Sequence, residues 1–291
     1  MPLHPLAEIF GYPFDNLTTE ASRFRRNRLC PFGNKVPNCT KDKANNPLGV
    51  CSIWNGEDRV ITCPIRFREN WIIAEDSADF FFSNEYQWTT LTEVRLVDRT
   101  RKSAGNIDVV LVSYDDTGRV VDFGSLEVQA VYISGNIRNP FEYYMNDPVK
   151  NTNMNWTKKP NYPKPDYLSS SRKRLVPQLI YKGGILKTWN KKMAVAINKG
   201  FYETLPPLKP IPKVDADVAW LIYDLQPDET TGQYHLARKD VIYTKFEDSI
   251  LTITRSEAGE VADFIELLQD KIDRKLDNNN PPDTETIDAQ F

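Results

Sequence analysis

The chain has 291 residues, a formal net charge of −3 and an apolar share of 40%, which is enough for one large globular domain with a small appendage. Its longest apolar runs are far too short to cross a bilayer, and its first residues show no basic segment followed by an apolar run. These features argue against a membrane partner and a secretory signal, so we expect a cytoplasmic protein.

The four cysteines, Cys30, Cys39, Cys51 and Cys63, fall in the first quarter of the chain, in a stretch rich in Pro, Asn and Gly. Four thiolates on one cation can fold a segment too short for its own core. We therefore predict that residues 1–68 form an N-terminal segment with a Cys₄ metal knuckle. The spacing alone makes zinc the default metal, and disulfides remain the alternative, although nothing indicates an oxidising compartment.

The main mixed α/β core is expected over residues 69–276. Clusters of aromatic and apolar residues follow Asn70 and fit either helix or strand. The β-branched run 107–114 and the run 119–123 flank a turn with Gly118 and predict a β-hairpin. Gly124 interrupts the second run, so we expect a bend or bulge there.

The later elements complete a mixed α/β pattern without internal repeats. They are a long Asn- and Pro-rich connection over 139–165, a helix over 176–190, strands over 193–197, 218–225 and 241–254, and an amphipathic helix from 259 to about 276. Residues 277–291 are acidic and are predicted to be a disordered tail.

A pair of carboxylates is predicted to meet across the hairpin. Glu127 and Gln129 are two residues apart and share a strand face, on which Glu127 can approach Asp108. Two carboxylates and the Val128 carbonyl suit Mg²⁺, which promotes in-line attack of water on phosphorus. Glu93 is a candidate third carboxylate, and Gln129 a candidate to orient the water. Carboxylates at a solvent-exposed sheet edge explain the same pattern about as often.

Basic residues gather in the middle of the chain. Residues 151–200 hold eleven Lys and Arg against the single acid Asp166, whereas residues 201–291 hold nine basic and nineteen acidic residues. Such a cationic region suits contacts to the phosphates of a nucleic acid. It includes Lys158, Lys159, Arg172, Lys173, Arg174, Lys191 and Lys192, and a second basic group, Arg23, Arg25, Arg26 and Arg28, precedes Cys30.

Other chemistries find little support. The two histidines, His4 and His235, lie in unrelated contexts, and the chain has no GxxxxGK[ST] loop and no GxSxG motif. Histidine-based nucleases, Walker-type phosphotransfer and serine hydrolases therefore fit poorly.

Together these motifs resemble the NotI-like type II restriction endonucleases of the PD-(D/E)xK nuclease superfamily. The cysteine segment is similar to the four-cysteine fold of that family, and Glu93, Asp108 and Glu127-Val128-Gln129 are similar to its catalytic elements, with Gln in place of the superfamily's Lys. The resemblance implies a PD-(D/E)xK restriction-endonuclease-like mixed sheet flanked by helices, and iron in the Cys₄ site.

The resemblance also implies a homodimer that cuts both strands of a palindromic, GC-rich duplex site and leaves a 5′-phosphate and a 3′-hydroxyl. Arg172, Lys173 and Arg174 are candidate groove contacts, and Arg138 is a candidate contact to the DNA backbone near the site. Two alternatives stay open: a sequence-independent repair or mobile-element nuclease of the same fold, and a non-enzymatic DNA-binding protein in which the carboxylates are structural.

Overall fold

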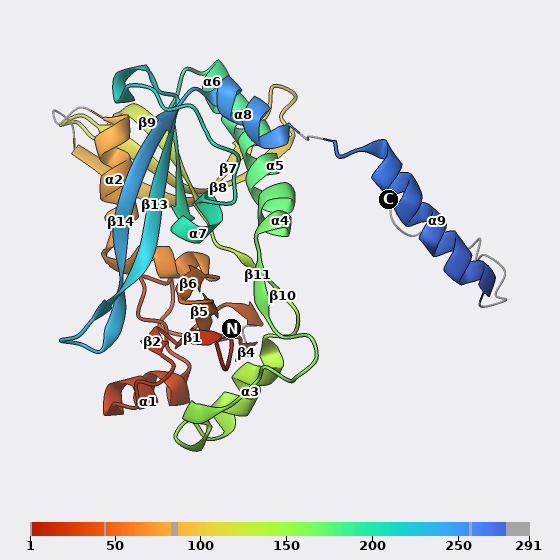
Figure 1. Cartoon of the computed structure of the whole chain (residues 1–291). Helices are drawn as coiled ribbons and strands as arrows, with labels where there is room; N and C mark the ends of the chain where they lie inside the picture. The colour runs from red at the N-terminus through yellow and green to blue at the C-terminus, as the bar shows by residue number, and fades with distance from the viewer. Residues whose placement is uncertain (1, 44, 83–86, 256–257, 278–291) are drawn as a thin grey trace. The chain divides into compact units, whose positions relative to one another are not determined.

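The computed structural model describes residues 2–43, 45–82, 87–255 and 258–277 (Figure 1). The chain divides into two compact units, Met1–Ile253 and Thr254–Phe291. The N-terminal segment and the predicted hairpin lie in the first unit, and the predicted amphipathic helix, α9 (Val261–Asp277), lies in the second. The predicted acidic tail falls outside the described residues, except for Asp277 at the end of α9.

The first unit is organised around a six-stranded sheet with the order β14-β13-β12-β9-β8-β7. Strand β12 runs parallel to both β9 and β13, and the other neighbours are antiparallel. The expected mixed α/β class with helices flanking a mixed sheet is therefore confirmed. The strands are β7 (Gln87–Val97), β8 (Ser103–Tyr114), β9 (Val120–Gln129), β12 (Met193–Asn198), β13 (Val218–Asp228) and β14 (Gln233–Thr244).

Strands β8 and β9 form the predicted hairpin, but the bulge predicted at Gly124 is wrong. Gly124 pairs with Leu111 in regular register, and the ladder shifts further out, between Ser113 and Tyr114. A Cβ atom at Gly124 would lie 2.4 Å from the ring of Phe81. The glycine therefore serves the close approach of an aromatic ring from helix α2 (Ile72–Phe81) and not a break in the strand.

The two faces of the sheet are covered by different helices (Figure 1). On one face, Leu126, Val128 and Ala130 pack in the same core cluster as residues of α2. On the other, Val195 and Ile197 pack in one cluster with Leu175 and Leu179 of a long helical stretch. This stretch is α4 (Tyr167–Ser170), the π-helical η3 (Ser171–Leu175), α5 (Val176–Gln178), the π-helical η4 (Leu179–Gly183) and α6 (Gly184–Thr188).

Two sequence predictions about the later elements need correction. The strand predicted over 241–254 ends at Thr244, and the apolar residues after it form helix α8 (Phe246–Thr254), because a short apolar run fits either structure. The predicted connection over 139–165 is also partly helical. It contains α3 (Arg138–Asn146) and the 3₁₀ turn η2 (Lys150–Asn153), and β11 (Lys164–Asp166), which begins within it, pairs with β10 (Tyr132–Ser134).

A small four-stranded sheet of order β2-β1-β5-β6 carries the N-terminal segment. A buried ion pair joins it to the main sheet: Arg66 Nε lies 3.0 Å from Glu8 Oε1, and Arg66 Nη2 donates to the carbonyl of Tyr234 on β14 at 2.8 Å. Such a pair needs all its donors satisfied, so it fixes how the two sheets meet. The remaining elements are β1 (Leu6–Ile9), β2 (Tyr12–Pro13), α1 (Thr19–Asn27), β3 (Asp42–Lys43), β4 (Asn46–Pro47), β5 (Val50–Asn55), β6 (Asp58–Ile61), η1 (Pro64–Trp71), α7 (Lys199–Tyr202) and η5 (Lys213–Asp215).

Within the described ranges, no helix has both the length and the apolar character that crossing a membrane requires.

Candidate active site and cysteine pocket

The candidate site lies where the β8–β9 ladder ends. The last paired residues are Val109 and Leu126, so Asp108 and Glu127 are the next residues on the two strands. Beyond this pair, Asp108 Oδ2 accepts a hydrogen bond from the backbone N–H of Val128 at 2.9 Å. The Asp108 side chain thus takes the hydrogen bond that a backbone carbonyl would accept in a continued ladder. The structure places Asp108 beside Glu127.

Glu127 is almost fully buried, with 1% of its surface exposed. Its Oε2 accepts from Lys182 Nζ at 2.7 Å and from Gln178 Nε2 at 2.9 Å. Burial raises the pKa of Glu127 to about 8, and the nearby Asp108 carboxylate adds to the rise while Lys182 opposes it. Its Oε1 is buried and, among the described residues, has no hydrogen-bond partner.

Gln129 and Val128 extend this polar group along β9. Gln129 Nε2 donates to Gln178 Oε1 at 2.5 Å, while its own Oε1 is buried and without a partner in the part of the chain that the structure describes. The carbonyl of Val128 accepts from Arg174 Nη2 at 3.4 Å. A buried oxygen without a partner is costly, so two such oxygens on neighbouring side chains indicate a place for a ligand.

The helical stretch supplies one face of the site through Arg174, Gln178 and Lys182. These residues are four apart, a spacing that puts side chains on one face of a helix. Sequence reasoning missed Gln178 and Lys182, although their spacing within the predicted helix was visible. Arg174 was predicted to contact the DNA groove, but in the structure it reaches the backbone of the carboxylate strand.

Glu93 is not brought to the two carboxylates. Thr92 pairs with Val109 and Val94 with Ile107, so the backbone of Glu93 lies across from Asp108. Its φ of 57° departs from strand geometry, and its exposed carboxylate contacts Lys35 Nζ at 2.9 Å. A role for Glu93 as a metal ligand therefore requires that this surface pair be broken.

The donor set at Asp108 and Glu127 fits Mg²⁺. In the described ranges no group of three or more His, Cys, Asp or Glu side chains is arranged to hold a metal ion. Mg²⁺ needs fewer protein ligands, because it is commonly bound through one or two carboxylates and keeps several waters. Two neighbouring carboxylates, the Val128 carbonyl and the buried Glu127 Oε1, which has no partner within the described ranges, meet that need.

The predicted DNA contacts differ in accessibility. Four of them are exposed to solvent: Lys158, Lys159, Arg172 and Lys173. Arg138, the predicted contact to the DNA backbone, instead forms ion pairs with Asp42 at 2.5 Å and with Glu142 at 3.5 Å. Arg25, from the second basic group, is 2% exposed and donates to the carbonyls of Pro13 and Asn16, which excludes it from the predicted phosphate contacts.

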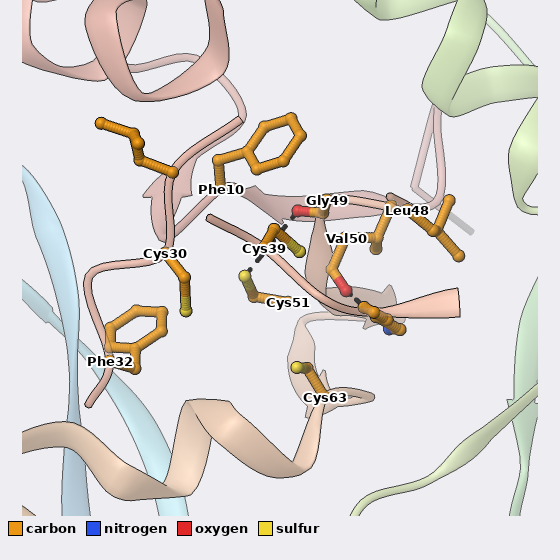
Figure 2. A pocket seen from close by; sticks show the side chains of 11 residues that line it. Phe10, Cys30, Phe32, Cys39, Leu48, Gly49, Val50, Cys51 and Cys63 are labelled. Atoms are coloured by element: carbon orange, nitrogen blue, oxygen red, sulfur yellow. Dashed lines mark hydrogen bonds between the residues drawn. The ribbon is translucent and has the colours of Figure 1, made fainter. Parts of the chain in front are cut away.

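The four cysteines line one pocket, and all four, each in a described segment, are free thiols (Figure 2). Burial raises the pKa of the Cys30 thiol to about 11, and the neighbouring Cys63 and Cys39 add to this rise. The thiols are not gathered into a ready metal group. Lys41 also lines the pocket, and its ammonium donates to the Val50 carbonyl at 2.6 Å and to the Thr62 hydroxyl at 3.0 Å.

The comparison with known families agrees with this arrangement. Among curated proteins, no sequence matches the chain. The family model of the restriction endonuclease NotI matches residues 15–236, a range that includes the four cysteines and the carboxylate site. Enzymes of this family are type II site-specific deoxyribonucleases, which act on double-stranded DNA. The chain therefore belongs to the NotI restriction endonuclease family.

Proposed function

We propose that the chain hydrolyses phosphodiesters of a specific duplex DNA site in an Mg²⁺-dependent reaction at Asp108 and Glu127. The observation that carries the proposal is the pair of carboxylates at the end of the β8–β9 ladder, next to the buried oxygens of Glu127 and Gln129 that lack a partner among the described residues. Family membership supports the reaction class, and the geometry supports the choice of residues.

Asp108, Glu127 and the Val128 carbonyl would hold the ion. When bound, Mg²⁺ supplies charge stabilisation at the scissile phosphate and lowers the pKa of a coordinated water. The oxygen of a water bonds to phosphorus in line with the 3′ oxygen, and the P–O3′ bond breaks. One proton leaves the attacking water and one reaches the departing 3′ oxygen, which gives a 5′-phosphate and a 3′-hydroxyl. The buried Oε1 of Gln129, without a partner among the residues that the structure describes, can accept a hydrogen bond from that water and orient it.

The cysteine pocket is proposed to hold a structural iron ion, with zinc as the alternative. Cys30, Cys39, Cys51 and Cys63 supply a Cys₄ donor set around one pocket, and such a set binds either metal. Burial disfavours the thiolate forms, so a bound cation would offset that cost.

The DNA partner is proposed to be a palindromic, GC-rich site bound by a homodimer, because two-fold symmetry presents one active site to each strand. Exposed Lys158, Lys159, Arg172 and Lys173 are the proposed contacts to it. Arg138 and Arg174 are also proposed contacts, but each would have to leave its present partner when DNA binds.

Cleavage of phage and plasmid DNA with Mg²⁺ tests the proposal. We expect discrete fragments whose sequenced ends share one site, and we expect Asp108→Asn to bind the same DNA without cutting it. A surface variant, Lys213→Gln, which removes an exposed pair with Asp79, is the matched control and should cleave normally. Ragged, sequence-independent products would support the repair-type nuclease, and binding without cutting under every divalent ion would support the non-enzymatic alternative.

A further inference from the structure

The carboxylate site contains a buried cation that the proposed mechanism does not yet use. Lys182 is 5% exposed, and its ammonium lies 2.7 Å from Glu127 Oε2. Within the described part of the chain, it is the one lysine or arginine hydrogen-bonded to a carboxylate of this site. The strand itself offers only the neutral amide of Gln129 next to Glu127.

The Lys182 side chain lies against strand β8. Lys182 comes from the π-helical segment η4, next to β8, and a Cβ atom added at Gly105 of β8 would lie 3.4 Å from Lys182 Cε. Gly105 also has a φ of 102°, a conformation that a residue with a side chain rarely adopts. A Cβ atom there would make an ordinary van der Waals contact with the lysine, so the backbone conformation, and not a shortage of space, is what favours glycine at this position.

A buried ion pair is a poor device for stability, because desolvation of the two charges offsets most of their attraction. A charge held in a water-poor site has a larger effect on a reaction than one in solvent. Hydrolysis of a phosphodiester concentrates negative charge on the phosphoryl oxygens and on the departing oxygen. A lysine ammonium has three N–H donors, and Glu127 uses one of Lys182's in this structure.

We propose that Lys182 is the positive charge of the active site: it positions the Glu127 carboxylate and directs its remaining donors to the attacking water or the scissile phosphate. The inference rests on the proposed function, and it assigns the helical stretch a part in the reaction beside its packing role. Gln178 holds the same carboxylate oxygen from the preceding turn and fixes its rotation.

Three variants test this role: Lys182→Gln, which keeps a hydrogen-bond donor without the charge, Lys182→Arg, which keeps the charge, and the control Lys213→Gln, which breaks an exposed pair at the same 2.7 Å distance. Single-turnover cleavage is measured at saturating Mg²⁺. Binding of Mg²⁺ to the protein without DNA is followed separately, through the rise in melting temperature that the ion produces.

We expect Lys182→Gln to cleave about 10- to 100-fold more slowly. The Mg²⁺ concentration at half of the melting-temperature rise should be no higher than that of the wild type, because removal of a cation does not weaken metal binding. Lys182→Arg should stay within about tenfold of the wild type, and Lys213→Gln should be unchanged.

Two outcomes would overturn the inference: wild-type cleavage by Lys182→Gln, or a defect that a higher Mg²⁺ concentration fully reverses, since the lysine would then only shape the metal ligand. If Lys182→Gln does not fold, Lys182→Arg decides, and a loss well beyond tenfold would count against the charge. A wild-type protein that cuts no DNA would refute the proposed function itself, a result separate from these.

Discussion

Replacement of Glu127 should show separately how much this residue contributes to the free energy of unfolding and how much to DNA cleavage. Glu127→Ala leaves Lys182 as a buried ammonium that is 5% exposed and has lost its 2.7 Å partner. Removal of one partner from a buried pair costs about 3–5 kcal/mol, so the free energy of unfolding should fall by that amount. Glu127→Gln keeps an acceptor for Lys182 and should cost less, about 1–3 kcal/mol.

Both Glu127 variants should lose cleavage by at least about 100-fold, because metal-based charge stabilisation contributes several kcal/mol and each 1.4 kcal/mol is a factor of ten. Urea unfolding at fixed pH measures the first effect, and single-turnover cleavage measures the second. The exposed pair Glu203–Lys199, 3.5 Å apart, provides the control, since Glu203→Ala should change stability by less than about 1 kcal/mol. Wild-type stability and cleavage in Glu127→Ala would show that the assigned site is wrong.

Four further predictions concern other parts of the chain. Gly124→Ala should destabilise the protein by about 1–3 kcal/mol through its contact with Phe81, whereas Gly184→Ala, where a Cβ meets nothing within 4 Å, should be neutral or slightly stabilising in thermal unfolding; equal effects would contradict the packing argument. Cys39→Ser should reduce the bound transition metal and the melting temperature, and elemental analysis that finds no metal in the wild type would exclude the Cys₄ site. His4 stacks on Phe14 at 3.8 Å, and burial lowers its pKa to about 4; the unfolded chain therefore takes up a proton first, so stability should fall by about 1–2 kcal/mol, discounted for partial exposure, as pH drops from 6.5 towards 4. His4→Phe should lack this loss, which pH-dependent urea unfolding will reveal. Arg172→Ala and Lys173→Ala should each reduce the slope of log affinity for DNA against log salt by about 1, and slopes identical to the wild type would remove them from the interface.

Some features of the site could be predicted from local sequence alone. The β-branched run ending in Tyr114 and the turn at Gly118 specify a hairpin, and the two-residue period puts Glu127 and Gln129 on one strand face. The four cysteines, close together in the sequence, line one pocket, whereas the metal knuckle predicted from their clustering stays a prediction. Each of these features depends on residues that are close together in the chain, so their spacing in the sequence is enough to predict it.

Other features depend on contacts between segments that are far apart in the chain, and the spacing of residues in the sequence does not predict such contacts. Gly124 looked like a strand break until the ring of Phe81, more than forty residues earlier in the sequence, was found against it. The apolar residues after Thr244 fit a strand as well as helix α8, and only packing decides between the two.

The sequence by itself determined that Glu127 and Gln129 share one face of β9, because side chains on a strand alternate with a period of two. It also predicted the β8–β9 hairpin, whose register brings Asp108 beside Glu127. Tertiary structure alone decided what surrounds them. Lys182 and Gln178 reach Glu127 across more than fifty residues of chain, whereas the predicted third carboxylate, Glu93, contacts Lys35 instead. The physical reason is that a buried charge must find its partner in space, and the packing of the helical stretch on the sheet determines which side chain that partner is.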